Sequence, residues 1–544
     1  MCKACQRFIS HAQQSDITAI LMLALAATAC LWMRRGNIDV SLADEAGYLS
    51  AGADWFSGGR PAAPWGPLYS FSYWVLSLVC PDRIGLYQLN QILVNIALPV
   101  AGFLYLRSWG ASIALSLLSC SLILASSIPD IWPRVSHFSL IILFLSIRMA
   151  MKRPSTLRFI VLLGAGFLIA AYARPEFYLS FLATTALAWA LIICSGYRKQ
   201  HRDAAALTEC VLLTLAAVVL LAVLGNPLGA SGSSDRRFLA FSQHYSLNRV
   251  LYSGEARNPW TEAGAIVDER FGDVGSVWGA AKSNPREFIW HLSVNARKLS
   301  LAWLRTALFD SHGVLPPQAD RLIHRIQILL FAAGCCWLAY ELRTGGFARQ
   351  EWFRRWTLMT TLCCLAIVPS ALLVHPRDHY LMPVLWLLLA FVAAASKEVK
   401  GGAARTDTLM AGMALGTTAA ALLLAGLESP KPRPVAEAIR WLDDQSWNRD
   451  LVLMDAEGGA GLLSNRRVTT VYSYERKPAE PFMQFIGRRR INAILVSSRL
   501  LQDPAFKSDG AFLEILASPE NHGFAIIPTP SPDLRFMVSQ AAVR

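Results

Sequence analysis

The chain has 544 residues, of which 54% are hydrophobic and 16% charged, and it contains 17 Trp and 25 Phe residues. So apolar a composition excludes a single water-soluble core and indicates a polytopic membrane protein. The formal net charge of +13 comes from Lys and Arg residues in short loops between apolar runs. This distribution is typical of membrane topology and argues against a nucleic-acid-binding face.

The first apolar run covers residues 17–33 and follows a polar N-terminus that carries Lys3 and Arg7. No small-residue cleavage site precedes the next charges, so we expect an uncleaved anchor that enters from the cytoplasm. Ten further runs of roughly 17 to 22 residues are long enough to cross a hydrocarbon core of about 30 Å. They lie near 85–106, 112–128, 136–151, 158–173, 177–196, 206–225, 322–341, 356–374, 380–396 and 407–427. The sequence therefore predicts an all-α polytopic membrane protein with about eleven transmembrane helices over residues 1–427.

The apolar run at 68–80 differs from the others because its about 13 residues are too few to span, and it is rich in Tyr, Trp and Phe. We expect it to form an interfacial helix. With that assignment every basic cluster falls on the cytoplasmic side, as the positive-inside rule requires. The clusters are Arg148, Lys152, Arg153 and Arg158; Arg198, Lys199 and Arg202; Arg343, Arg349, Arg354 and Arg355; and Lys397, Lys400 and Arg405.

Because successive spans cross the membrane in alternating directions, the same assignment predicts which connections lie outside. They are a first external loop at 36–84, short turns at 129–136, 174–176 and 375–380, and a large external loop at 226–321. The tail is placed outside as well. We therefore expect a multi-pass protein of a bacterial cytoplasmic membrane, with a cytoplasmic N-terminus and a periplasmic C-terminal domain.

The tail, residues 428–544, alternates short apolar runs with helical patterns after a Pro-rich linker, SPKPRP at 429–434. Strands are expected at 451–456, 493–498 and 525–530, and helices at 434–444 and 481–490. This alternation predicts a small α/β domain. The GRRR sequence at 487–490 is expected to be a solvated helix end, with contact to phosphate headgroups as the alternative.

The eleven cysteines lie mostly in apolar runs, and neither the large external loop nor the tail contains any. No disulfide framework is expected. Cys2 and Cys5 with His11 could begin a zinc site, but a structural site needs four ligands and no fourth lies nearby.

Clusters of ionisable residues gather at one face of the expected membrane domain. Ionisable groups at membrane depth cost free energy unless they are paired or hydrated. Acids and bases that gather there from distant segments therefore suggest a shared site. The alternative is that each cluster is only an interfacial cap or a set of snorkelling side chains. The clusters are Asp44 and Glu45; Asp130 and Arg134; Arg174 and Glu176; and His375, Arg377, Asp378, His379 and Tyr380.

The stretch DEAGY at 44–48 carries the chemistry that the sequence suggests most clearly. On a helix Asp44 and Tyr48 share one face, whereas Glu45 is turned about 100° away. A carboxylate in a partly dry cleft is suited to taking a proton from an acceptor hydroxyl, and fixed arginines suit a phosphate leaving group. The combination favours group transfer from a phosphate ester over hydrolysis.

Several of these segments carry a resemblance. The acidic pair after the first span, GPLYSFSYW at 66–74, PD at 129–130, ARPEFYL at 173–179 and HPRDHYLMPVLWLLLA at 375–390 are similar to the C superfamily of multi-spanning, lipid-phosphate-dependent glycosyltransferases. Within it the chain resembles the aminoarabinose transferases of lipid A and the protein O-mannosyltransferases. The resemblance covers residues 16–427 and is mainly one of layout.

This resemblance implies a sugar donor on a polyprenyl phosphate, inverting transfer at the outer face and an extracytoplasmic acceptor. It implies that Asp44 is the catalytic carboxylate, with Glu45 as a sugar or metal contact. The lysine that precedes the family's PPLY-type segment is absent here, where Trp65 and Gly66 stand, and Arg60 is expected to substitute. The expected donor-phosphate and substrate-binding residues are Tyr48, Arg60, Tyr69, Asp130, Arg134, Arg174, Glu176, His375, Arg377, His379 and Tyr380.

In the large external loop, 231–244 and 255–264 mix arginine, histidine and aromatic residues, as a lid over a sugar phosphate would. Any solvated loop of that length gives the same pattern. We expect no obligatory metal, because arginines suffice to neutralise a phosphate; a divalent cation on Glu45, His375 and His379 is the alternative.

Two other classes of function stay open. A lipid-linked sugar flippase or transporter would also need intramembrane charges, but with internal repeats and charges near the midplane. A non-catalytic membrane assembly protein would tolerate the loss of Asp44. No Walker-type phosphate loop occurs, so nucleotide-driven transport lacks support.

Overall fold

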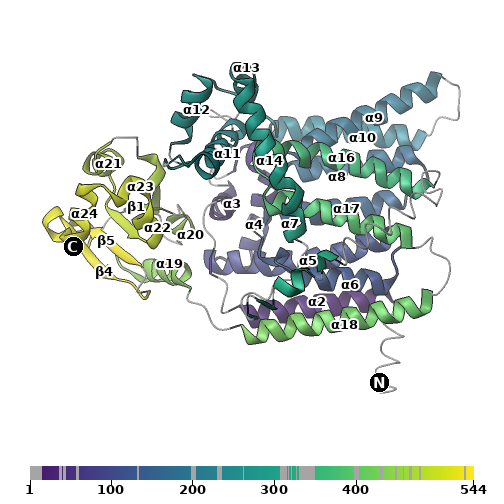
Figure 1. Cartoon of the computed structure of the whole chain (residues 1–544), viewed down its shortest axis with the longest axis horizontal. Coiled ribbons are helices and arrows are strands. Elements are labelled where there is room, and N and C mark those ends of the chain that lie inside the picture. The colour runs from purple at the N-terminus through teal and green to yellow at the C-terminus, as the bar shows by residue number, and fades with distance from the viewer. Residues whose placement is uncertain are drawn as a thin grey trace.

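A computed structural model describes most of the chain. The described residues are 15–35, 39–40, 44–56, 60–131, 134–197, 204–229, 236–255, 257–260, 262–306, 315–316, 318–319, 321–325, 327–329, 350–396, 403–428, 433–447, 450–456, 459–464, 468–476, 480–531 and 534–543. Long helices lie side by side in a bundle, and a domain with a β-sheet follows at one end (Figure 1).

The bundle is built from ten described apolar helices. Seven are long and apolar enough to cross a membrane: α2 (Asp16–Arg34), α5 (Arg83–Ser108), α9 (Phe177–Tyr197), α10 (Ala204–Leu224), α16 (Glu351–Leu373), α17 (Asp378–Ser396) and α18 (Ala403–Leu427). Three shorter apolar helices accompany them: α6 (Ile113–Leu124), α7 (Val135–Met151) and α8 (Thr156–Ala171). These ten match ten of the eleven expected spans. The remaining one, at 322–341, lies mostly outside the described residues.

The helix boundaries follow local capping chemistry. Ser15, Asp82, Ser112 and Ser155 each accept a main-chain N–H in the first turn of α2, α5, α6 and α8. Such caps satisfy amides that have no partner inside the helix. Gly102 in α5 leaves room for the Trp386 ring of α17, because an added Cβ would lie 2.1 Å from that ring. The bundle core is therefore closely packed where these two helices cross.

Two short helices stand between α2 and α5, and the second of them coincides with the short helix expected at 68–80. They are α3 (Asp44–Ala53) and α4 (Pro67–Ser77), and the 3-10 turn η2 (Ala63–Trp65) precedes α4. Gly66 joins η2 to α4 with φ of 65°, and its Cα approaches the Ala173 carbonyl so closely that a Cβ would lie 2.2 Å from that oxygen. The turn therefore requires glycine. It docks α4 on the turn that contains Arg174.

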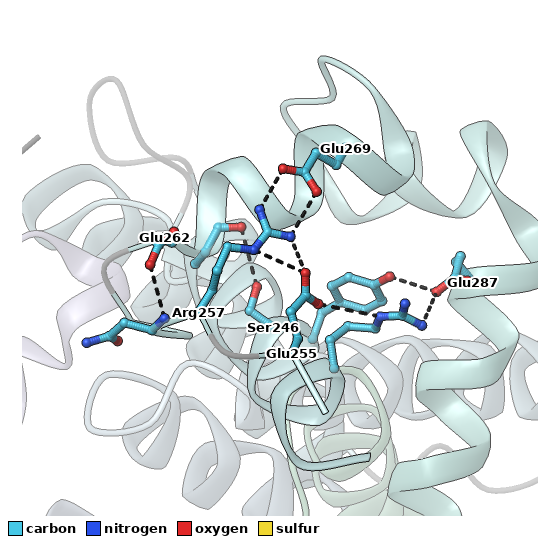
Figure 2. Close-up of polar contacts among 10 residues, drawn as sticks. Ser246, Glu255, Arg257, Glu262, Glu269 and Glu287 are labelled. Carbon is cyan, nitrogen blue, oxygen red and sulfur yellow. Dashed lines mark hydrogen bonds and ion pairs between the residues drawn. The ribbon is translucent and has the colours of Figure 1, made fainter. Parts of the chain in front are cut away.

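Four helices follow α10 and form what we call the external helical unit: α11 (Arg236–Ser253), α12 (Ala263–Phe271), α13 (Val277–Ser283) and α14 (Pro285–Thr306). Phe241, Tyr245, Ile266 and Phe271 form its small core. Figure 2 shows its polar contacts: Arg257 pairs with Glu255 and with Glu269, the latter at 2.6 Å, and Tyr245 donates to Glu287 at 2.7 Å. The unit is thus a folded layer rather than an open loop.

The tail folds around a five-stranded mixed sheet in the order β2-β1-β3-β5-β4. The strands are β1 (Leu451–Asp455), β2 (Val468–Tyr472), β3 (Ala493–Val496), β4 (Phe524–Pro528) and β5 (Arg535–Ser539). The first three are parallel, whereas β5 runs antiparallel to β3 and β4. Three of these strands lie where the sequence predicts them; β2 and β5 were not expected.

Helices cover the sheet on both sides and complete the α/β architecture. They are α19 (Pro434–Asp444), α20 (Ala460–Leu463), α21 (Phe482–Arg489), α22 (Ser498–Gln502), α23 (Pro504–Lys507), α24 (Gly510–Ala517) and α25 (Gln540–Val543). The helices expected at 434–444 and 481–490 coincide with α19 and α21. The predicted fold class, a helical membrane protein with a small C-terminal α/β domain, is confirmed.

The α/β domain contacts the bundle at α3, at the segment before α3 and at the start of α5. Asp39 accepts the main-chain N–H groups of Val435 and Ala436 at 3.0 and 2.9 Å, at the start of α19. Arg83, at the start of α5, donates to the Leu462 carbonyl in α20 at 2.5 Å. The helices α3, α4, α11 and α12 lie at the same end of the bundle as this domain (Figure 1), which we call the domain end.

Candidate functional site

Two adjacent carboxylates at the start of α3 lie in different environments. Asp44 is exposed at the domain end, whereas Glu45 is completely buried. Successive residues of a helix are turned by about 100°, so neighbours cannot share a face. Tyr48, one turn further on, is buried, and the Asp44 charge acts on its hydroxyl. The helix therefore presents Asp44 and turns Glu45 into the protein.

Glu45 is held by three donors. Tyr69 and Tyr73 donate to its Oε1 at 2.5 and 2.6 Å, and the Arg134 main-chain N–H donates to Oε2 at 3.1 Å. Asn90 Nδ2 supports both tyrosine oxygens at 2.7 and 2.9 Å. Burial and the Glu45 charge raise the pKa of both tyrosines well above its ordinary value, so both stay protonated donors. This geometry favours a structural role for Glu45 over the sugar or metal contact that the sequence suggested.

Asp44 has a cationic neighbour that enters from the external helical unit. Arg236, the first residue of α11, stacks over the Trp65 ring at 3.8 Å and donates to the Pro64 carbonyl. It also acts on the Tyr48 hydroxyl, and the charges of Asp44 and Arg236 act on each other. Although burial opposes its charge, these neighbours raise the pKa of Arg236, so it is a fixed cation. The structure thus places a guanidinium within the electrostatic reach of Asp44.

A second arginine comes from the turn between α8 and α9. Arg174 forms an ion pair with Glu176 at 2.5 Å, donates to the Ser136 hydroxyl and lies 4.6 Å from the Tyr380 ring centroid. Burial opposes its charge, but Glu176 and Tyr380 outweigh that effect and raise the pKa of Arg174. These residues line a small pocket together with His379 at the start of α17. Arg174 also acts electrostatically on Tyr48, which connects this pocket to the Asp44 group.

His375 and Arg377 lie in a different group, on the turn between α16 and α17. The His375 ring centroid lies 5.6 Å from that of His244 in α11, and the Arg377 guanidinium lies 5.9 Å from the Trp260 ring centroid. Lys298 and His291 of α14 act on the same imidazoles. The structure therefore divides the expected substrate-binding residues into an Asp44 group and a histidine group.

Four expected site residues lie outside both groups, and one of them, Tyr69, belongs to the Glu45 network described above. Asp130 forms an ion pair with Arg34 at 2.7 Å, and Arg34 also pairs with Glu428 at 2.9 Å, so these charges tie α2 to the end of α18. Arg60 is exposed, and within the described residues it makes no ion pair. Arg134 contributes its main-chain N–H to Glu45, while its buried guanidinium lies 5.9 Å from the Tyr87 ring centroid. The expectation that Arg60 substitutes for the absent lysine therefore gains no support. The guanidinium that lies over Trp65 belongs to Arg236.

The structure also adds residues that the sequence did not single out. Arg236 belongs to the 231–244 segment, whose first five residues lie outside the described residues. The only sequence signal for Arg236 was the mixture of arginine and aromatic residues in that segment. Ser136, Tyr73 and Asn90 gave none, because polar residues inside apolar helices are common. Only their convergence on Arg174 and Glu45 identifies them.

The three residues considered as metal ligands do not come together. Glu45 belongs to the tyrosine network, His375 packs against His244, and His379 lines the Arg174 pocket. Across the described parts of the chain, no group of three or more His, Cys, Asp or Glu side chains is arranged to hold a metal ion. The pair formed by Cys2 and Cys5 lies outside the described residues.

These elements define a polytopic α-helical membrane protein. At its domain end α3 carries the exposed Asp44 carboxylate, and Arg236 of the external helical unit and Arg174 of the bundle both act on the neighbouring Tyr48 hydroxyl.

No model of a known protein family and no curated protein matches the chain. It is similar to two solved structures of ArnT from Cupriavidus metallidurans, one bound to undecaprenyl phosphate and one in the apo state. The TM-scores are 0.38 and 0.37 and the sequence identities 11% and 13%. Both alignments cover 96% of this chain, and they cover 97% and 98% of the solved chains.

Proposed function

We propose that the protein is a membrane glycosyltransferase that moves a sugar from a polyprenyl-phosphate carrier to an acceptor outside the cytoplasm. The observation that carries this proposal is the exposed Asp44 carboxylate within electrostatic reach of the fixed cation Arg236, with Arg174 acting on the same Tyr48 hydroxyl. A base next to a phosphate-binding pair is what transfer from a phosphate ester requires. The bundle consists of membrane-length helices, which suits a donor that is held in the membrane by a lipid tail.

In this mechanism Asp44 takes the proton of an acceptor hydroxyl. The acceptor oxygen then forms a bond to the anomeric carbon of the sugar, while the bond from that carbon to the phosphate oxygen breaks. The electron pair of the broken bond stays on the polyprenyl phosphate, and Arg174 and Arg236 stabilise the negative charge that develops there. Attack opposite to the leaving group inverts the configuration at the anomeric carbon.

The neighbours of the two arginines fix them before substrate binds. The Trp65 ring and the Pro64 carbonyl hold Arg236, and Glu176 and Ser136 hold Arg174. Such preorganisation lowers the cost of reorienting charges during the reaction. Because two guanidinium groups are already present, we propose that the reaction needs no obligatory metal ion.

The compartment follows from the basic loops. We propose that the domain end faces the periplasm, because the Lys and Arg clusters of the sequence occur in the connections expected at the opposite end. The acceptor would then be a glycolipid, a polysaccharide or a protein of the cell envelope.

The test is an assay of the purified full chain with polyprenyl-phosphate sugars. Asp44→Asn keeps the size of the side chain but removes its basicity, so turnover should fall by a factor of about 10² to 10⁴ while donor binding is retained. Arg174→Ala and Arg236→Ala should instead weaken donor binding by about 1.5–3 kcal/mol, because each removes a charge-assisted contact. Arg237→Ala, at the exposed neighbour of Arg236, is the matched control and should leave both quantities nearly unchanged.

Wild-type turnover by purified Asp44→Asn would refute the proposal that this carboxylate is the base. A flippase or transporter would move the lipid-linked sugar across vesicles without transferring it, so transport by the wild type with no sugar on any acceptor would favour that class. An assembly protein would show neither activity.

A further inference from the structure

The histidine group lies outside the Asp44 group, and the proposed transfer does not use it. His244 from α11 and His375 from the turn before α17 lie with their ring centroids 5.6 Å apart and their ring planes tilted by 31°. The Trp260 ring meets His244 edge-on at 5.6 Å and lies within 5.9 Å of the Arg377 guanidinium. Two distant segments therefore enclose a pair of imidazoles beneath an indole.

Each imidazole has a buried nitrogen without a hydrogen-bond partner in the described structure. His244 Nδ1 lies 2.8 Å from the Ala240 carbonyl, which can only accept, so Nδ1 carries the proton. Its other nitrogen, Nε2, is buried and has no partner among the described residues. The same holds for Nδ1 of His375. His244 as a whole is only 6% exposed, so an orphaned nitrogen there is costly unless a ligand satisfies it.

The charges around the pair are positive. Arg377 and Lys298 act on both imidazoles, from the turn before α17 and from α14, and no carboxylate is among the groups that act on them most strongly. Burial comes first, and with these cations it lowers the pKa of His244 and of His375 to about 3. Fixed positive charges repel a metal cation. They attract an anion, which would also favour protonation of an imidazole.

We propose that His244, His375 and Arg377 form a second anion subsite, which takes a phosphate group and acquires a proton when that group binds. A neutral imidazole offers its unpartnered nitrogen only as an acceptor, so it must be protonated before it can donate to a phosphate oxygen. Arg377 and Lys298 supply the permanent charge. The ligand class is a phosphate ester, bound through its oxygens.

The subsite adjoins the proposed donor site. His379, which lines the Arg174 pocket, lies within electrostatic range of Arg174 and also of Arg377 and His244. A substrate with two phosphate groups, or a donor phosphate beside a phosphorylated acceptor, would therefore reach both places. The identity of the molecule that supplies the phosphate group rests on the proposed function, whereas anion binding with proton uptake does not.

The test uses sulfate, which keeps its charge over the pH range of interest, with the purified full chain. Calorimetric titration in two buffers of different ionisation enthalpy gives the number of protons taken up with each sulfate. We expect uptake of up to one proton per sulfate, larger near pH 5 than near pH 7, and an affinity that rises by up to about tenfold for each pH unit of acidification. Sulfate binding without proton uptake would overturn the proposal.

Substitutions of the two histidines show which side chain takes up the proton. His375→Gln and His244→Gln each keep a side-chain N–H donor that does not titrate, so the proton-linked component should shrink in each and vanish in the double variant. Arg377→Ala should weaken sulfate binding while retaining proton uptake, and this readout remains if a glutamine variant does not fold. Arg270→Ala, at an exposed arginine of α12, is the matched control. Proton uptake that survives in the folded double variant, or Zn²⁺ binding at the pair in place of sulfate, would refute the subsite.

Asp44→Asn should bind sulfate with unchanged proton uptake even though its turnover falls by a factor of about 10² to 10⁴, which separates this inference from the proposed transfer. The source of the phosphate follows from two comparisons with His375→Gln. Weaker binding of a polyprenyl diphosphate but not of the monophosphate would identify the carrier. A raised KM for a phosphorylated acceptor, with both carriers unaffected, would identify the acceptor.

Discussion

At the scale of single residues, Asp44 and Glu45 show how one step along a helix separates two carboxylates. Asp44 is exposed beside Arg236, so its oxygens can meet a substrate. Glu45 is buried, and Tyr69, Tyr73 and the Arg134 amide use its oxygens. A buried carboxylate is tolerated because these hydrogen bonds replace water. We infer that Glu45 holds α3 against α4 and so aims Asp44.

Glu45→Gln should therefore act on stability. An amide nitrogen would face hydroxyl donors, leaving buried groups unsatisfied, and the free energy of unfolding should fall by about 1–3 kcal/mol. Thermal unfolding of the purified protein in detergent measures this, with Asp44→Gln as the exposed control that should change the melting temperature little. An unchanged melting temperature together with a loss of turnover as large as that of Asp44→Asn would mean that Glu45 acts in the chemistry.

At the scale of elements, α14 joins the external helical unit to the bundle. His291 Nε2 lies 3.0 Å from the Leu373 carbonyl, and Asn295 donates to the Leu372 and Val374 carbonyls at 2.7 and 3.2 Å. These carbonyls end α16 and have no partner within that helix. Because His375 and Arg377 follow directly, α14 fixes the turn that carries the histidine group.

The buried histidines of this unit should make its stability depend on pH. Burial lowers the pKa of His291 to about 4 from an ordinary 6.5. Between these values the unfolded state binds more protons than the folded state, so stability is fully present above the ordinary pKa and is lost as the pH falls toward about 4. His244 and His375 act in the same direction.

We therefore expect the melting temperature to fall between about pH 7 and about pH 5, and to fall less in His291→Gln, whose amide does not titrate. The variant is less stable at every pH, so the difference between the two pH slopes is the quantity to compare. Equal slopes in the wild type and the variant would contradict a role for His291 in acid sensitivity.

At the scale of the whole molecule, three layers meet around Asp44. The external helical unit supplies Arg236, and the α/β domain brings Tyr472 near enough for the Asp44 charge to act on it. The bundle supplies Arg174, which acts on Tyr48, one turn along α3 from Asp44. Side-chain contacts join the layers in pairs: Asp39 caps α19, and Asn258 donates to Asp503 at 3.4 Å. An acceptor that reaches Asp44 would therefore meet the α/β domain.

The proposed orientation is tested by cysteine labelling in intact cells, in a chain cleared of its native cysteines. A membrane-impermeant thiol reagent should modify Lys282→Cys, in α13, and should miss Lys152→Cys, which follows α7 at the other end; both native side chains are exposed. Labelling in the opposite pattern would place the domain end in the cytoplasm and refute an external site.

Much of the architecture could be predicted from local sequence. The apolar runs of membrane length predicted ten helices to within a few residues. In lipid a segment must satisfy its own main-chain hydrogen bonds, and it therefore forms a helix regardless of which segments surround it. The short aromatic run before α5 was expected to be interfacial, and α19 was predicted to the residue. The strands β2 and β5 were not expected, since they are stabilised by pairing with β1, β3 and β4 rather than by a pattern of their own.

The sequence by itself determined the membrane class, the helix positions and the placing of Asp44 and Glu45 on different helix faces, since hydrophobicity and helical periodicity are properties of the local chain. Only the tertiary structure decided which charges meet. Arg236 reaches Asp44 across almost two hundred residues, Asp130 pairs with Arg34 instead of joining the site, and His375 pairs with His244. Charge pairing depends on distance and burial, and both are fixed by packing between segments that are remote in the chain.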